Sequence, residues 1–264
     1  MTSSDAHTLY EIEDGIATLT LNRPEARNAW SQEMIDGTHA ALDAAARDPE
    51  VRALIVTGAG KAFCAGGDLR AMRDREGMFA GDPVELRGRY ANGLQNITRH
   101  FERFDKPTIA AINGAAIGAG LDLTLMCDLR VASSRAKFGS TFAAVGLIPG
   151  DGGAYLLTRI VGFSRAVELV ITARVIGAER AEAIELVHEV VEPEQVLPRA
   201  REIAAEIARL PAPAVRMAKV ALRKTYNRDM EVALELTAAL QGLVQHTEAH
   251  EQAVLGMLEK IGKG

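Results

Sequence analysis

Apolar strand-like runs alternate with helical patterns through much of this 264-residue chain, and this alternation most constrains its fold. The runs rich in strand-forming residues predict strands over 16–21, 51–57, 107–112 and 129–132. Between and after them, the sequence predicts helices over 31–47, 84–104, 118–127 and 152–160, the first of them capped by Ser31. Strands that alternate with helices indicate an α/β fold with parallel strand pairing. From about Ala178 onward, helical segments interrupted by prolines predict a C-terminal helical subdomain.

Composition and charge narrow the class of protein. Hydrophobic residues make up 48% of the chain, and the net charge of −5 does not favour nucleic acid or an anionic membrane as partner. Cys64 and Cys127 form no CxxC motif, which is typical of a reduced cytoplasmic protein. Residues 1–7 lack the basic and apolar parts of a signal peptide, and no apolar run is long enough to predict a membrane span.

Two glycine-rich stretches carry the strongest functional signal. Residues 63–68 read FCAGGD and residues 113–122 read NGAAIGAGLD, and each follows a predicted strand. Small residues in such turns leave backbone N–H groups free to point outward. Two N–H groups from separate strands can converge on one oxygen and stabilise negative charge there. An isolated stretch of this kind is more often only a tight turn.

Five segments in order carry a resemblance to the crotonase (enoyl-CoA hydratase/isomerase) superfamily: Asn22–Ala29, Lys61–Leu69, Lys106–Asp128, Gly146–Gly153 and Leu258–Lys260. The resemblance implies a crotonase-like spiral of ββα units over residues 1–195. It also implies a helical trimerisation region over 196–264, and a homotrimer or a dimer of trimers. The implied substrate is an acyl-CoA thioester, with no cofactor beyond its CoA moiety and with no metal.

The resemblance also implies a set of reacting groups. The backbone amides of Gly67 and Ala119 would hold the enolate oxygen, and one such donor contributes roughly 3–4 kcal/mol to transition-state stabilisation. Asp122 takes the first of the two glutamate positions of the family's hydratases, unless it serves only as an acid near a helix N-terminus. Phe142 takes the second position and cannot transfer a proton. Asp151 lies one residue from where some isomerases of the family carry a carboxylate, unless it is only a turn or capping residue.

Residues for CoA binding follow from the same resemblance: Arg27, Ala65, Asp68, Leu69 and, toward a neighbouring subunit, Lys260. The basic stripe Arg216, Lys219 and Arg223 is interpreted either as a CoA contact or as solvated surface charge. The sequence as a whole most resembles the sequences of enoyl-CoA hydratases. The loss of the second glutamate leaves two alternatives: a 3-enoyl/2-enoyl-CoA isomerase that uses one carboxylate, and a non-catalytic acyl-CoA-binding family member.

Overall fold

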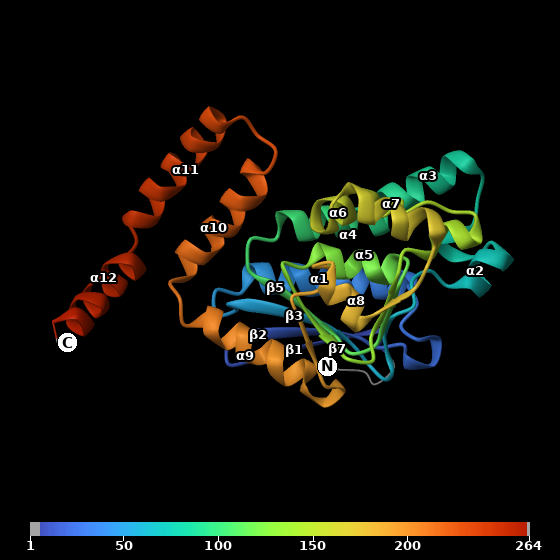
Figure 1. Ribbon diagram of the computed structural model, residues 1–264, viewed down its shortest axis with the longest axis horizontal. Helices are drawn as coiled ribbons and strands as arrows, with labels where there is room; N and C mark the ends of the chain where they lie inside the picture. The colour runs from blue at the N-terminus through green and yellow to red at the C-terminus, as the bar shows by residue number, and fades with distance from the viewer. Residues whose placement is uncertain (1–5, 263–264) are drawn as a thin grey trace.

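The computed structural model describes residues 6–262. Residues 1–5, where we predict no leader peptide, and residues 263–264 lie outside the described part. Strands of two sheets form the centre of the molecule, and helices cover them (Figure 1).

The larger sheet has six strands in the order β1-β2-β3-β5-β7-β10. Their bounds are Thr8–Glu13, Ile16–Leu21, Ala53–Gly58, Thr108–Ile112, Leu129–Ser133 and Glu189–Val191. β1 pairs with β2 in antiparallel fashion, and every other neighbouring pair is parallel. β3 and β5 are almost wholly buried, as expected for strands covered on both faces. The predicted parallel pairing is therefore confirmed.

The smaller sheet has four short strands in the order β4-β6-β8-β9, with bounds Ala62–Cys64, Ala115–Ile117, Lys137–Gly139 and Ile176–Gly177. Three strands of the first sheet, β3, β5 and β7, are each followed by a short strand of the second sheet and then by helices. This path occurs at β3-β4, at β5-β6 and at β7-β8. The repeated ββα path is the spiral that the family resemblance implies.

Helices after each unit cover the sheets. Their bounds are α1 Gln32–Arg47, α2 Leu69–Asp74, α3 Pro83–Asn92, α4 Leu94–Arg103, α5 Ala119–Met126, α6 Gly153–Val161, α7 Phe163–Thr172 and α8 Ala178–Ala183. The predicted cap of α1 is confirmed, because the Ser31 hydroxyl accepts a hydrogen bond from the Met34 amide at 3.1 Å. The single helix predicted over 84–104 is wrong. Gly93, with φ −96° and ψ −108°, lies outside the helical region and divides it into α3 and α4.

The helix α9, Val196–Ala208, packs against the larger sheet on the face opposite α1 and α5 (Figure 1). Val196, Ala200 and Ala204 are buried there with Ile55 and Ile109. The boundary between a spiral core over 1–195 and a C-terminal helical subdomain over 196–264 stays a prediction. α9 comes after that boundary and still forms part of the sheet's covering.

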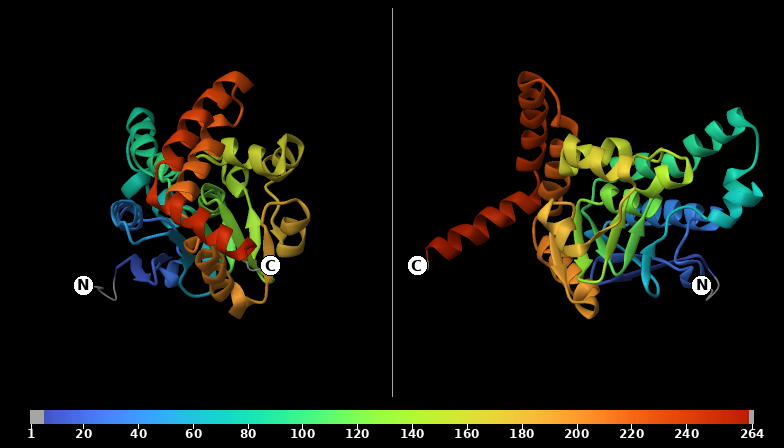
Figure 2. Two further views of the ribbon diagram at one scale, coloured as in Figure 1. Left: turned by 90° about the vertical axis from the view of Figure 1, so that its left-hand side faces the viewer. Right: turned by 45° about the vertical axis from the view of Figure 1, so that its right-hand side comes forward.

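The last three helices form an arm that extends away from the sheets (Figures 1 and 2). They are α10 Ala212–Thr225, α11 Met230–Gln245 and α12 Glu248–Ile261. Within residues 6–262, no helix is long and apolar enough to cross a membrane.

Ion pairs attach α10 to the body of the molecule. Lys219 lies 2.7 Å and Arg223 lies 2.8 Å from the Asp128 carboxylate, and Arg216 pairs with Asp105. Burial lowers the pKa of Lys219 to about 8, although the neighbouring Asp128 favours the charged form. The sequence suggested that Arg216, Lys219 and Arg223 contact CoA or are solvated surface charges. Neither interpretation describes this contact, because all three side chains bind carboxylates of the same chain.

Candidate active site

One buried asparagine fixes the first glycine-rich loop. The Asn28 side-chain amide donates hydrogen bonds to the carbonyls of Ala62 at 2.8 Å and Phe63 at 3.1 Å, which belong to β4. Its carbonyl oxygen accepts a hydrogen bond from the Arg23 amide at 2.8 Å. Asn28 is fully buried, so these bonds replace those it would form with water. Sequence reasoning used the segment 22–29 only as a family signature and missed this bracing role.

The two glycine-rich loops adjoin each other so closely that only glycine fits at their contacts. A Cβ atom at Gly66 would lie 2.5 Å from the Ile117 carbonyl oxygen and 3.3 Å from the Ala119 nitrogen, and φ is +89° there. A Cβ atom at Gly120 would lie 2.1 Å from the Cys64 carbonyl oxygen. The two loops therefore adjoin, and the convergence of their N–H groups on one oxygen stays a prediction.

The two amides predicted to bind the enolate oxygen belong to these adjoining loops. Ala119 is the first residue of α5, so its N–H group has no partner within the helix. Among residues 6–262, the N–H groups of Gly67 and Ala119 donate no hydrogen bond to a protein acceptor. A Cβ atom at Gly67 would lie 2.2 Å from the terminal methyl group of Met72 and 3.4 Å from the ring of Phe79. Side chains that follow the first loop thus cover Gly67.

Asp122 and Asp151 lie together in the interior, the first on α5 and the second just before α6. Their relative exposures are 1% and 2%. Asp122 Oδ2 accepts a hydrogen bond from the Gly153 amide at 3.0 Å, which ties α5 to the start of α6. The Oδ1 atoms of both carboxyl groups are buried and receive no hydrogen bond from a conventional donor in the described chain. A single proton shared between the two carboxyl groups would give both atoms a partner.

The electrostatics of this acid pair, Asp122 and Asp151, favour that shared proton. Burial raises the pKa of Asp122 well above its usual value, and the charge and hydrogen bonding of Asp151 raise it further. Burial also raises the pKa of Asp151, while its hydrogen bond with Asp122 works in the opposite direction. Like charges at this depth cannot both be ionised without a large penalty. Burial and mutual repulsion therefore favour retention of a proton by the pair, and Asp122 has the pKa that is raised well above its usual value.

Two further titratable groups lie in the field of Asp151. Burial raises the pKa of Tyr90, on α3, and the charge of Asp151 adds to the shift. Burial raises the pKa of the Cys64 thiol to about 12, so Cys64 is a neutral core residue rather than a nucleophile.

Phe142 places an apolar ring beside the second loop. It belongs to a short 3₁₀ helix, Thr141–Val145, and its ring tip lies 3.8 Å from the position of a Cβ atom at Gly118. Gly118, with φ +56°, immediately precedes Ala119. Phe142, at the position expected for a second proton-transferring acid, thus lies beside the second loop and carries a ring that cannot transfer a proton.

The predicted CoA residues of the first half gather at the first loop. The Arg27 carbonyl accepts a hydrogen bond from the Ala65 amide at 3.0 Å, and the Arg27 side chain is exposed. Asp68 caps α2 by accepting a hydrogen bond from the backbone amide two residues on, at 3.0 Å. Leu69, which follows it, is 61% exposed. Lys260 instead lies near the end of α12, on the arm that extends from the body (Figure 2).

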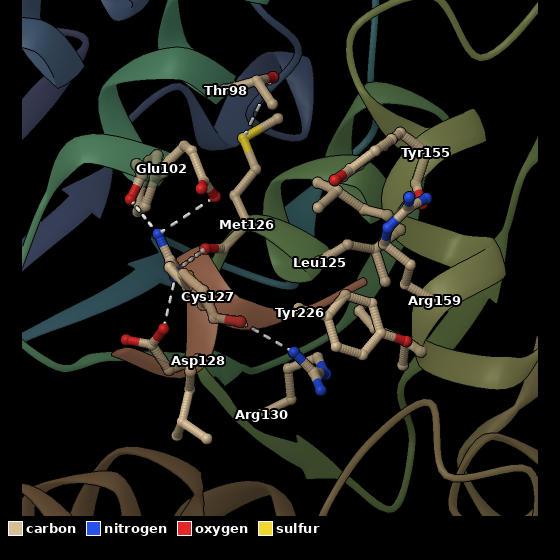
Figure 3. Close-up of a pocket in the computed structure, with 15 residues that line it drawn as sticks. Thr98, Glu102, Leu125, Met126, Cys127, Asp128, Arg130, Tyr155, Arg159 and Tyr226 are labelled. Carbon is tan, nitrogen blue, oxygen red and sulfur yellow. Dashed lines mark hydrogen bonds and ion pairs between the residues drawn. The ribbon is translucent and has the colours of Figure 1, made fainter. Parts of the chain in front are cut away.

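A separate pocket of about 270 Å³ lies around the C-terminal end of α5 (Figure 3). The Arg159 guanidinium stacks on the Tyr155 ring at 3.4 Å and faces the Tyr226 ring at 6.0 Å. Neither member of the acid pair is among the residues that line it. Thr98 and Met126 line its inner wall, and the Thr98 hydroxyl lies 3.7 Å from the Met126 sulfur. Within residues 6–262, no group of three or more His, Cys, Asp or Glu side chains is arranged to hold a metal ion.

Comparisons with known proteins agree with this geometry. The family model "Enoyl-CoA hydratase/isomerase" matches residues 11–263. A crotonyl-CoA hydratase of Syntrophomonas wolfei is 38% identical, and the match covers 96% of this chain and 95% of that protein. A 1,2-epoxyphenylacetyl-CoA isomerase of Escherichia coli is 33% identical, with coverages of 96% and 95%. The crystal structure of an enoyl-CoA hydratase from Bacillus anthracis superposes with a TM-score of 0.90 at 32% identity and covers 96% of each chain. The chain therefore belongs to the enoyl-CoA hydratase/isomerase family of enzymes.

Proposed function

We propose that this enzyme hydrates the double bond of an enoyl-CoA thioester and that the acid pair supplies both proton transfers. The observation that carries the proposal is the burial of Asp122 and Asp151 together, next to the two glycine-rich loops. A hydratase needs one group that accepts a proton from water and one that donates a proton to carbon. Two carboxyl groups that share one proton provide both at neutral pH.

The reaction follows from these positions. The thioester oxygen accepts hydrogen bonds from the Gly67 and Ala119 amides, which stabilise the enolate as charge moves onto that oxygen. In this proposal Asp151 is the ionised member of the pair and accepts a proton from water as the water oxygen bonds to the β-carbon. Asp122 then donates its proton to the α-carbon. Each step moves one proton, and the acid pair again holds one proton at the end.

Phe142 supports a second candidate reaction on the same site. Its ring takes the place of an acid and lies against the second loop, so this position cannot hold an attacking water by a hydrogen bond. Isomerisation of a 3-enoyl-CoA to a 2-enoyl-CoA requires no water. In that reaction Asp151 removes a proton from the α-carbon, and the acid pair returns one to the γ-carbon.

Binding of the substrate requires rearrangement around the first loop. Asp122 and Asp151 are closed to solvent, and Met72 and Phe79 cover Gly67. We place the CoA moiety outside this cover, against the exposed side chain of Arg27, the backbone of Ala65–Asp68 and the side chain of Leu69.

We also propose that the arm α10–α12 assembles the chain into a homotrimer or a dimer of trimers. Large apolar side chains are exposed along α11 and α12: Met230, Val232, Leu234, Leu243, Val254, Leu255, Met257, Leu258 and Ile261. An apolar surface of this extent requires a partner in water. In such an assembly Lys260 would reach the CoA moiety bound to a neighbouring copy. The free thiols of Cys64 and Cys127 in the core support a reducing, cytoplasmic location.

Purified protein incubated separately with crotonyl-CoA and with a 3-enoyl-CoA tests the reaction. Loss of the enoyl absorbance with a mass gain of one water supports hydration. Conversion of the 3-enoyl substrate without a change in mass supports isomerisation instead. Binding of acyl-CoA without turnover of either substrate would leave the non-catalytic binding protein as the better description.

A further inference from the structure

We propose that Thr98 and Gln95, on one face of α4, are positioning residues that hold the 150–152 loop so that the Asp151 carboxyl group faces Asp122. This inference rests on the proposed function of the acid pair. Neither residue belongs to a motif that the sequence analysis used.

Two side-chain donors from α4 bind consecutive carbonyls of this loop. Gln95 Nε2 donates to the Gly150 carbonyl at 2.7 Å, and the Thr98 hydroxyl donates to the Asp151 carbonyl. Residues three apart on a helix lie on the same face, so one helix can provide both donors. The next carbonyl, that of Gly152, accepts hydrogen bonds from the backbone amides of α6. α4 therefore fixes the part of the loop that α6 does not.

Steric contact adds to the hydrogen bonds. A Cβ atom at Gly152 would lie 2.8 Å from the Thr98 methyl group, so the loop backbone packs directly on this side chain. On its other side Thr98 approaches Met126, at the end of the helix that carries Asp122 (Figure 3). Thr98 thus contacts both elements that bring the two carboxyl groups together.

The helix behind these donors is well anchored. Leu94, Ile97 and Phe101 of α4 are 5%, 0% and 1% exposed and pack in the main core. Asp151 Oδ1, in contrast, has no conventional donor of its own within the described chain. The Asp151 carboxyl group hydrogen-bonds with Asp122 and with its own backbone amide, so its direction depends on where α4 holds that backbone.

The test replaces each donor with a group of similar shape. Thr98→Val removes the hydroxyl, Thr98→Ser keeps it, and Gln95→Met removes the amide. Thr172→Val is the matched control, because its hydroxyl donates to the Glu168 carbonyl at 2.6 Å and accepts from the Arg174 guanidinium at 3.2 Å, and neither partner belongs to the 150–152 loop. The readouts are kcat, KM, the pH–rate profile and the carboxyl titration of protein labelled with ¹³C at aspartate side chains.

We expect Thr98→Val and Gln95→Met each to lower kcat about tenfold, the effect of one lost hydrogen bond, with KM changed less than about twofold. The apparent pKa values of the acid pair should shift in both the pH–rate profile and the ¹³C titration. Thr98→Ser should restore them, and Thr172→Val should leave them unchanged.

Unchanged titration of the acid pair in both Thr98→Val and Gln95→Met would overturn the proposal, whatever happens to activity. A loss of activity that Thr98→Ser shares with Thr98→Val would also overturn it, because the hydroxyl would then not be the relevant group. If the wild-type protein turns over neither enoyl-CoA, the proposed function fails. The ¹³C titration still decides the positioning role in that case.

Discussion

The Asp122 carboxylate accepts a hydrogen bond from the Gly153 amide at 3.0 Å, and a Cβ atom at Gly153 would lie 2.1 Å from Asp122 Oδ1. The first turn of α5 is thus locked to the first residue of α6. Asp151 lies immediately before α6, so this contact brings the second carboxyl group to the first. Proton transfer in the proposed reaction depends on that contact.

Asp122→Asn should abolish turnover without unfolding the protein. The amide keeps the shape and can still accept the hydrogen bond from Gly153, but it cannot donate an acidic proton. We expect kcat to fall between about 10²-fold and 10⁴-fold, the range for a general acid. Steady-state kinetics and circular dichroism on the same sample check this, and full activity in the variant would remove Asp122 from the mechanism.

The same variant should change how stability depends on pH. The folded-state pKa of Asp122 is above 3.8, so the native protein binds more protons than the unfolded chain from about that pH upward. The contribution of Asp122 to the free energy of unfolding therefore falls as pH rises toward the folded-state pKa. The substituted asparagine side chain does not titrate, so the variant should gain stability relative to wild type as the pH rises above the ordinary aspartate pKa of about 3.9. Urea unfolding at several pH values measures this gain, and a constant difference would contradict it.

Gly66→Ala should reduce both stability and activity. The new methyl group would meet the Ile117 carbonyl oxygen, and alanine would be strained at φ +89°. We expect a loss of about 1–3 kcal/mol in the free energy of unfolding, with a marked fall in kcat because the two loops separate. Gly88→Ala is the control, because a Cβ atom there meets nothing within 4 Å. A Gly66→Ala enzyme with wild-type kcat would show that the contact between the loops does not matter for the reaction.

Phe142→Glu should raise the rate of hydration relative to isomerisation. The glutamate would place a carboxyl group beside Gly118, where the present ring can neither transfer a proton nor accept a hydrogen bond from water. Product analysis with crotonyl-CoA and a 3-enoyl-CoA gives the ratio, and Phe142→Leu controls for the loss of the ring. An unchanged ratio would mean that residue 142 does not face the substrate.

Lys219→Met should destabilise the attachment of the arm. It leaves the largely buried Asp128 without one of its two cations, and loss of one partner of a buried pair costs about 3–5 kcal/mol. Lys224→Met, which removes an exposed pair at 3.8 Å, should cost less than about 1 kcal/mol. Thermal unfolding of both variants makes the comparison, and equal effects would show that burial of Lys219 contributes nothing.

Most long periodic segments of the fold could be predicted from the sequence, but the six-residue strand β1 and the short strands could not. The Ser31 cap and the strand Ile16–Leu21 carry local signals, and both were confirmed. β4, β6, β8, β9 and β10 have two or three residues each, which is too short for a period of two to be recognised. Long-range pairing, rather than local preference, makes them strands.

Some residues of the candidate site could likewise be identified from the sequence, and others only from the structure. The family motifs identified Asp122 and both glycine-rich loops. Only the three-dimensional structure could show that Asp151 lies beside Asp122, because a turn residue and a buried acid look alike in one sequence. The donors Gln95 and Thr98 carry no motif at all. The roles assigned to these residues stay predictions until they are tested by substitution.

Asp151→Asn, assayed beside Asp122→Asn with crotonyl-CoA and a 3-enoyl-CoA, tests the central claim most directly. We predict that both variants bind acyl-CoA as the wild type does and lose at least about 10²-fold in kcat. Wild-type turnover by Asp151→Asn would contradict the account, because one buried carboxyl group would then carry the chemistry alone.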